Sequence, residues 1–370
     1  MNIKISIFGD FVAQNSTDIF ISSDLKRIIA SSDIAVCNFE APVDGYNRAA
    51  DRVGPKIKQS SIAPTLLKEW GFNAIQLANN HMLDFGEGGC KDTINAFKDI
   101  TTIGAGTYEE AYKIKVIQVK TKKVGFLSCV HHEFGVWDSN SSTQKIGTAW
   151  ICHYLIQKRI SEAKETVDYL IVLPHAGVEE TDAPIPEWRE LYRAFIDWGA
   201  DAVIGTHPHV PQGWEVYHDK PIFYSLGNFY FDVLNSPHPF WSRSIAVELF
   251  FKDNHVSYNV NSLYFKIGYI GEDLCEDRID YHKYLCSLLN EDRYMEYCNE
   301  MARNKWNCYR NWLVRGLGAY SLSLGFVDSL KTCLYSLIKK RPSTLLVNTL
   351  QCESHRWTIL RAQKYDKVFN

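Results

Sequence analysis

The sequence predicts an α/β fold in which two mixed sheets pack face to face, with helices on their outer sides. Short apolar runs alternate with helical patterns, as they do where helices join parallel strands. Two other segments, 114–130 and 244–265, alternate apolar and polar residues on both sides of a turn and predict antiparallel hairpins. Crossovers and hairpins in one chain indicate mixed sheets.

The expected elements alternate along the chain. Strands are expected at Ile3–Phe8, Ile34–Val36, Ala74–Leu77, Tyr169–Leu173 and Ala202–Ile204. Helices are expected at Asp24–Ser31, Ala63–Trp70, Cys90–Lys98, His153–Thr166 and Glu187–Trp198. Gly71 and Gly199 directly follow two of these helices, which is a typical way for a helix to end.

From Asp273 onward the pattern becomes helical, which predicts a domain of residues 1–270 and a helical C-terminal region, 271–370, packed on it. An apolar stripe at spacings of three and four predicts one helix; its members are Leu313, Leu317, Tyr320, Leu324, Val327, Leu330, Leu334 and Leu337. A membrane-spanning helix is disfavoured because Asp328 and Lys331 would each cost about 2.5 to 3.5 kcal/mol at its centre. Packing on the first domain is favoured, with a helix at the membrane surface as the alternative.

Composition narrows the possible classes of protein. Apolar types make up 46% of the 370 residues, which excludes a disordered chain. The 40 basic and 43 acidic residues give a net charge of −3, which predicts no general attraction for nucleic acid. Ten scattered cysteines with no C-x-x-C pair predict reduced thiols. The first residues lack the features of a signal peptide, so a cytoplasmic location is expected.

Polar side chains with oxygen or imidazole donors follow five of the expected strands. They belong to Gly9-Asp10, Asn38-Phe39-Glu40, Asn79-Asn80-His81, His175 to Glu179, and Gly205 to His209. Ligands of open α/β sheets bind beyond the carboxyl ends of the strands, so these loops are expected to converge. Their donor types suit Mn²⁺, Zn²⁺ or Fe²⁺, and one or two such ions would serve a hydrolase.

Taken in order, these motifs resemble those of a known family. The set also includes Asp84 and Gly86, Pro208 and Val210, and Tyr224 to Phe229. It resembles the signature of the CapA family of poly-γ-glutamate capsule biosynthesis, which is itself similar to the calcineurin-like metallophosphoesterases. The resemblance covers Met1 to about Phe265. It implies a four-layer α/β/β/α sandwich.

The resemblance also implies roles for individual residues. Six are expected as metal ligands: Glu40 as the bridging carboxylate, Asn80, His175 and His207 at one ion, and Asp10 and His209 at the other. His81 resembles the histidine that donates a proton to the leaving group. Asp84 lies three residues later, where it could orient the His81 ring or cap a helix, and both roles stay open. Val12 replaces a histidine of the phosphoesterase pattern, so the number of ions also stays open.

Substrate-binding residues are expected around the same crevice. The loop Pro42 to Lys58 carries four cationic side chains, and Lys56 is the chosen contact for an anionic polymer or a phosphorylated substrate, with a solvated surface loop as the alternative. Glu179 and Asn228 are the other expected contacts, Asn228 with loop support as an alternative. In His131-His132-Glu133, at most one histidine can face the crevice, because adjacent strand residues point to opposite faces.

Two functions remain open from the sequence. One is a metal-dependent hydrolase or transferase that acts on an amide or phosphoester bond in capsule or cell-surface polymer metabolism. The other is a non-catalytic component that binds polymer or other capsule synthesis proteins. The same ions polarise carbonyl and phosphoryl oxygens, so the ligand types alone do not select the bond.

Overall fold

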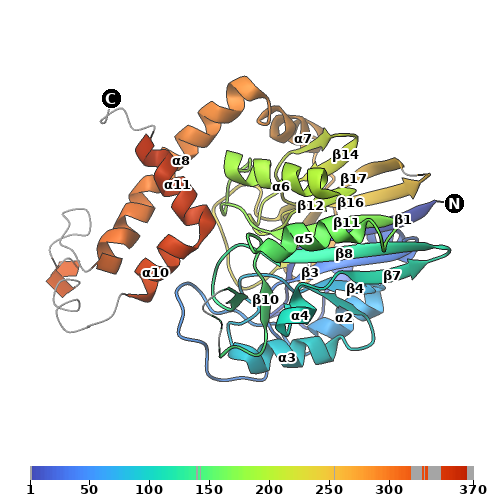
Figure 1. Ribbon diagram of the computed structural model, residues 1–370, viewed down its shortest axis with the longest axis horizontal. Coiled ribbons are helices and arrows are strands. Elements are labelled where there is room, and N and C mark those ends of the chain that lie inside the picture. Colours follow the sequence, from blue (N-terminus) through green and yellow to red (C-terminus); the bar gives the residue numbers. More distant parts are fainter. Residues whose placement is uncertain are drawn as a thin grey trace.

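The computed structural model describes residues 2–138, 141, 143–253, 255–317, 327–328, 330–331 and 343–364. Two sheets form the centre of this part of the chain (Figure 1). The larger one has nine strands among the described residues: β2 (Phe20–Ile21), β18 (Tyr269–Glu272), β17 (His255–Lys266), β16 (Arg243–Lys252), β1 (Ile3–Val12), β3 (Ile34–Phe39), β4 (Ala74–Gln76) and β5 (Thr101–Ile103) in that order, with β15 (Asn228–Phe231) paired to β1.

The second sheet has six strands in the same described part of the chain. Their order is β13 (Trp214–Tyr217), β14 (Lys220–Phe223), β12 (Ala202–Ile204), β11 (Tyr169–His175), β8 (Lys122–Val130) and β7 (Lys115–Val119). A small third sheet consists of β6 (Ala105–Gly106), β10 (Gly147–Ala149) and β9 (Val136–Trp137). Parallel and antiparallel neighbours occur in both large sheets, as the sequence predicted.

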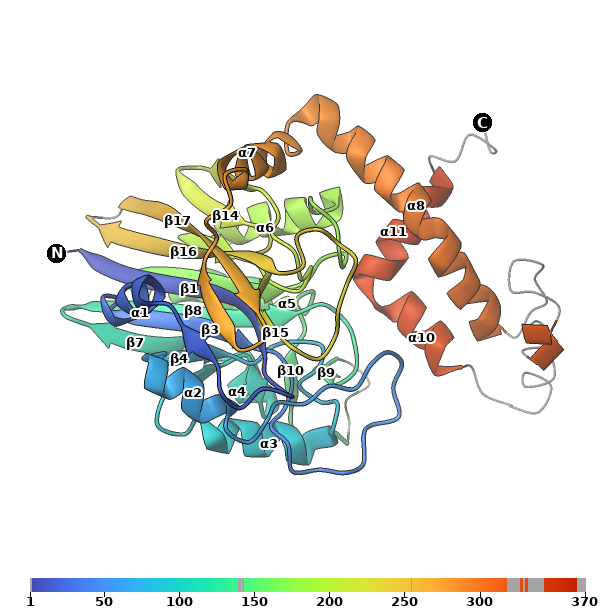
Figure 2. The same cartoon turned by 180° about the vertical axis from the view of Figure 1, so that it is seen from behind.

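Helices cover the outer faces of the two large sheets. The larger sheet carries α1 (Ser23–Ala30), α2 (Ala63–Trp70) and α3 (Gly86–Ala96). The second sheet carries α5 (Tyr154–Ala163) and α6 (Pro186–Trp198), while the short α4 (Tyr108–Ala111) lies beside the small sheet. The four layers α/β/β/α are therefore confirmed, and Figure 2 shows the same layers from behind.

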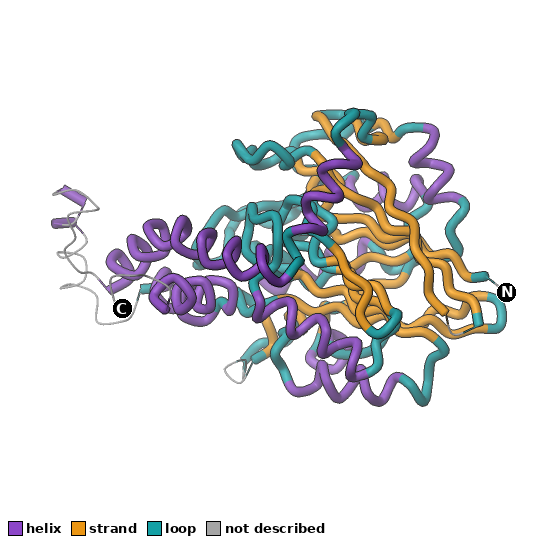
Figure 3. Tube along the Cα trace, turned by 90° about the horizontal axis from the view of Figure 1, so that it is seen from above, coloured by secondary structure: helices purple, strands orange, loops and turns teal. Residues whose placement is uncertain are grey.

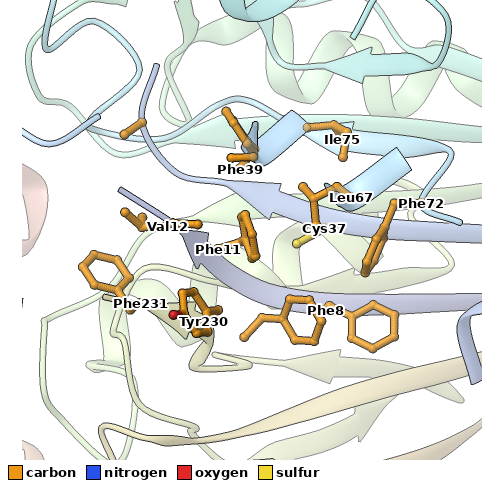
Figure 4. Packing of buried hydrophobic residues seen from close by; sticks show 14 of the residues in the cluster. Phe8, Phe11, Val12, Cys37, Phe39, Leu67, Phe72, Ile75, Tyr230 and Phe231 are labelled. Atoms are coloured by element: carbon orange, nitrogen blue, oxygen red, sulfur yellow. The ribbon is translucent and has the colours of Figure 1, made fainter. Parts of the chain in front are cut away.

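The central strands of both sheets, such as β3 and β11, are buried on two faces, which explains their continuous apolar sequences. In β11, Tyr169, Ile171 and Leu173 face the other sheet, whereas Leu170 and Val172 face the helical layer. The outer core of the larger sheet is aromatic, and Figure 4 shows its side chains around β1 and β3. This packing fixes the strand ends from which the polar residues project.

The end of β1 is the strand end that differs most from the prediction. We expected the first strand to end at Phe8, but β1 continues to Val12. The reason is β15, which pairs in parallel with the end of β1 and aligns Asp10 with Asn228 and Val12 with Phe231. Asp10 and Asn228 therefore both lie in strands.

The C-terminal helices gather at the end of the molecule opposite the N-terminus, as the views in Figures 1 and 3 agree. They are α8 (Glu291–Leu317), α10 (Thr344–Gln351) and α11 (Glu353–Lys364), whereas α7 (Arg278–Ser287) lies beside the second sheet, against β13. Of the predicted apolar stripe, Tyr320, Leu324, Leu334 and Leu337 lie outside the described residues. No helix within the described ranges is long and apolar enough to cross a membrane.

Several contacts join these helices to the α/β part of the chain. The Tyr297 hydroxyl accepts a hydrogen bond of 2.8 Å from the Asp182 backbone, and Arg361 pairs with Glu187 at 2.8 Å. The rings of Trp188 and Trp357 meet edge to face, 4.7 Å apart. The division of the chain into two domains near residue 270 stays a prediction.

Candidate metal centre

Asp10 enters the site because the backbone passes very close to a neighbouring strand at Gly9. A Cβ atom at Gly9 would lie 1.8 Å from the Gly227 carbonyl oxygen, so only glycine fits there. The next residue, Asp10, is fully buried and accepts hydrogen bonds from Asn38 Nδ2 at 2.7 Å and from the His207 backbone at 3.2 Å. These bonds aim its carboxylate into the interior.

Glu40 follows β3 and is also fully buried. Neither of its carboxylate oxygens has a hydrogen-bond partner among the described residues. The nearest cationic candidates are His209 Nε2, 3.7 Å from Glu40 Oε1, and His175 Nε2, 3.8 Å from the same oxygen. Burial raises the pKa of Glu40 well above its usual value, and the neighbouring Asp10 raises it further. A buried carboxylate without hydrogen bonds would be stabilised by a bound cation.

Two buried histidines, His175 and His207, face the same region. His175 ends β11, with Nε2 2.9 Å from Asn80 Oδ1 and Nδ1 2.9 Å from Thr206 Oγ1. His207 Nδ1 lies 3.3 Å from His175 Nε2. Burial, and then the charges of neighbouring histidines, lower the pKa of both His175 and His207 well below the usual value. Neutral imidazole is the form that binds a metal.

The loop that carries His207 and His209 has an unusual backbone. Their φ angles are +102° and +61°, in the left-handed region that favours glycine. Such conformations cost free energy and gather at functional sites. His209 is held in place by Asn228, whose Oδ1 lies 3.0 Å from His209 Nδ1.

The donors form two groups, each with its atoms within 4.8 Å of one another. The first consists of Asp10, Glu40 and His175, and the second of Glu179, His207 and His209. All six expected ligands thus lie in one region, because Asn80 contacts His175 directly. Glu179, expected as a substrate contact, lies with two of the histidines instead. Which ligand serves which ion stays a prediction.

His81 and Asp84 form a buried pair beside these groups. Asp84 Oδ2 lies 2.7 Å from His81 Nδ1 and accepts a 2.9 Å hydrogen bond from the Ile57 backbone. The helix that follows begins at Gly86 with Phe85 as its N-cap residue, so Asp84 does not cap it. Of the two roles left open from the sequence, contact with His81 is the one in the structure.

Arg52 is the residue that the sequence analysis did not single out. Its Nε pairs with Asp84 Oδ1, and its Nη2 lies 2.6 Å from His81 Nδ1. Lys56, chosen from the same loop, is exposed and donates to the backbone oxygens of Arg52 at 2.5 Å and Gly54 at 3.1 Å. The only sequence feature that could have indicated Arg52 was Asp84, because a carboxylate that is buried needs a cationic partner.

A cavity of about 340 Å³ opens beside His81. Arg52, Asn80 and Glu179 line it from the α/β part of the chain, and Trp312, Asn348 and His355 line it from the C-terminal helices. Its charged lining also includes Glu133 and Glu180, so carboxylates outnumber the single arginine. An anionic substrate would therefore be repelled unless cations were bound there.

Residues 8–233 match the model of a family described as "Bacterial capsule synthesis protein PGA_cap". This chain belongs to the PGA_cap family. It is 33% identical over 263 residues to capsule biosynthesis protein CapA of Bacillus anthracis, covering 66% of this chain and 61% of that one. It is also 33% identical over 213 residues to PGA biosynthesis protein CapA of Bacillus subtilis (strain 168), with 56% of each chain covered.

Solved structures offer weaker likenesses to this PGA_cap chain. The calcineurin-like phosphoesterase YfkN from Bacillus subtilis gives a TM-score of 0.41 at 14% identity, covering 70% of this chain and 90% of that one. A 5′-nucleotidase from Candida albicans gives 0.42 at 12%, covering 78% and 54%. The chain spans about 61% and 56% of the length of the two CapA relatives. Every site residue from Asp10 to Asn228 lies inside the PGA_cap match, whereas Trp312, Asn348 and His355 lie beyond it.

Proposed function

We propose that this PGA_cap protein is a metal-dependent hydrolase or transferase that acts on an amide or phosphoester bond of a capsule or cell-surface polymer. The observation that carries the proposal is Glu40, a fully buried carboxylate with no hydrogen-bond partner for either oxygen among the described residues. The names of the CapA relatives supply the polymer context, since they refer to capsule and PGA biosynthesis.

One or two divalent ions, Mn²⁺, Zn²⁺ or Fe²⁺, suit the donors of this site. Asp10, Glu40 and His175 would hold one ion, with Asn80 beside them, and Glu179, His207 and His209 could hold another. Such an ion polarises a carbonyl or phosphoryl oxygen and makes bound water a nucleophile near neutral pH. It also supplies the positive charge that an anionic polymer or a phosphorylated substrate needs in a cavity rich in carboxylates.

His81 would give a proton to the leaving group. Asp84 contacts Nδ1 of the ring, so the other nitrogen, Nε2, is the one available to the substrate. Arg52 donates a hydrogen bond to Asp84 and lines the cavity, so it holds in place the carboxylate that orients the His81 ring. General acid catalysis of this kind contributes about 10² to 10⁴-fold.

Metal content and turnover test the proposal together. Wild type, Glu40→Gln and the control Glu165→Gln, at an exposed position, are loaded with manganese or zinc and analysed by plasma mass spectrometry. Each is then assayed on p-nitrophenyl phosphate and on γ-glutamyl p-nitroanilide. We expect Glu40→Gln alone to lose metal affinity by about 100-fold and to lose turnover of one of the two substrates.

The outcomes separate the two functions. Equal metal content in wild type and Glu40→Gln would refute the role of Glu40 as a ligand. Metal binding without turnover of either substrate would refute the enzyme and favour a polymer-binding component of a capsule synthesis complex.

A further inference from the structure

A third group of donors lies outside the two described above. His131, Glu133 and Cys352 each offer one ligand atom, and these atoms lie within 4.8 Å of one another. His131 and Glu133 follow β8, whereas Cys352 lies between α10 and α11, more than two hundred positions later in the sequence. Glu133 also lines the cavity beside His81, but none of the three is a ligand in the proposed function. Among the three groups in the described residues, this is the one that contains sulfur.

The hydrogen bonds of Ser354 show that Nδ1 of His131 carries a hydrogen. The Ser354 hydroxyl has one hydrogen, and it donates it to the Gly177 carbonyl oxygen, which can only accept. Ser354 Oγ also accepts a 3.0 Å hydrogen bond from Trp188 Nε1. Its contact of 3.2 Å with His131 Nδ1 must therefore use a hydrogen on the histidine. In the neutral ring, this places the lone pair on Nε2.

The lone pair of His131 lies in the interior of the protein, beside Glu133. His131 is 1% exposed, and its Nε2 has no hydrogen-bond partner among the described residues. Glu133 Oε1 lies 3.6 Å from this nitrogen. Tetrahedral zinc with bonds of 2.0 to 2.3 Å holds its ligand atoms roughly 3.5 Å apart, so this pair already has the spacing of two zinc ligands. A hydrogen bond from the other ring nitrogen is the usual support of a ligating histidine.

We propose that His131, Glu133 and Cys352 bind a zinc ion that fastens the junction of α10 and α11 to the segment after β8. Imidazole, carboxylate and thiolate together suit Zn²⁺ better than the harder cations that prefer oxygen alone. Binding converts the Cys352 thiol to a thiolate, forms a zinc–sulfur bond and releases one proton to solvent. No oxidation or reduction takes place.

The position of this site gives it a role. His355 and Asn348, on either side of Cys352 in the sequence, line the cavity beside His81. The zinc site would thus hold this wall of the cavity against the α/β part of the chain. It is not the only attachment, because Glu353 accepts hydrogen bonds from the His132 backbone at 2.6 Å and from Trp150 Nε1 at 2.8 Å. Loss of zinc should therefore loosen the wall without unfolding the protein.

Cobalt substitution tests the site independently of the proposed function. A thiolate bound to Co²⁺ gives a near-ultraviolet charge-transfer band, which oxygen and nitrogen ligands do not give. The full chain, kept reduced, is loaded with Co²⁺ and compared with Cys352→Ser and with the control Cys308→Ser, at an exposed thiol. We expect the band in wild type and Cys308→Ser and its loss in Cys352→Ser, with about one equivalent of zinc lost as well.

Two further variants sharpen the result. Cys352→Asp offers a carboxylate in place of the thiolate and should keep zinc while losing the band. Glu40→Gln changes the other site and should keep the band. If Cys352→Ser does not fold, cadmium NMR of the wild type must show a sulfur-shifted signal. A wild type without the band or that signal, or a band that survives in folded Cys352→Ser, would overturn the proposal and leave His131 and Glu133 as an ion pair.

Discussion

The replacement of Glu40 by glutamine should stabilise the metal-free protein. Both oxygens of the Glu40 carboxylate are fully buried without hydrogen-bond partners among the described residues, and a buried group in this state costs about 1 to 3 kcal/mol. Glutamine has a similar shape and no charge, and its amide can donate a hydrogen bond to the neighbouring Asp10 carboxylate. We therefore expect metal-free Glu40→Gln to be about 1 to 3 kcal/mol more stable than metal-free wild type.

Metal should remove most or all of that difference in stability. At a free ion concentration of 100 times the wild-type Kd, binding stabilises the folded wild type by about 2.7 kcal/mol. If the variant binds about 100-fold more weakly, the same concentration equals its Kd and stabilises it by only about 0.4 kcal/mol. The difference of about 2.3 kcal/mol offsets most or all of the advantage of the variant without metal.

Urea unfolding followed by circular dichroism measures both effects, first with a chelator and then along a titration with manganese or zinc. Glu165→Gln, an exposed replacement of the same kind, should respond to metal as the wild type does. A metal-free Glu40→Gln protein that is less stable than wild type would refute the unpaired carboxylate. Equal stabilisation of both proteins by metal would refute its role as a ligand.

Three other changes have defined outcomes. His81→Asn should keep its metal but lose about 10² to 10⁴-fold in kcat on a poor leaving group and much less on an activated ester, and equal losses in parallel assays would remove His81 from acid catalysis. Glu215 is half-buried, which by itself raises its pKa, but hydrogen bonds from Arg193 and Arg189 outweigh this effect and lower the pKa from 4.5 to about 2. The resulting stabilisation of the folded protein, roughly 2 to 3 kcal/mol, is present above pH 4.5 and is lost as the pH falls toward 2. Glu215→Gln should therefore reduce the loss of stability at low pH, as measured by urea unfolding. Gly9→Ala should cost about 3 kcal/mol or more in the same assay, because its Cβ would overlap Gly227, and an unchanged midpoint would contradict the close approach.

The layers of the fold could be predicted because each central strand contacts two cores. β11 is apolar at nearly every position, since one set of its side chains meets the other sheet and the alternate set meets α5 and α6. Such a continuous apolar segment can be recognised in the sequence without knowing which elements pack against it. The end of β1 was not visible in this way, because it depends on pairing with β15, a segment far along the chain.

The residues of the site likewise divide into those that the local sequence predicts and those that depend on contacts between distant segments. The expected ligands could be named because each lies at the carboxyl end of a strand, where a polar residue interrupts an apolar run. The choice between Arg52 and Lys56 depended on distances that a loop sequence does not contain: four residues apart in one loop, the first reaches Asp84 and the second bends back to the backbone. Cys352 was harder still, because nothing near it in the sequence indicates that it meets His131. Strands and helices can be predicted because their apolar residues recur with a regular period in the sequence. A contact between a loop and a helix junction has no such period. The residues that form this wall of the cavity could therefore be identified only in the folded structure.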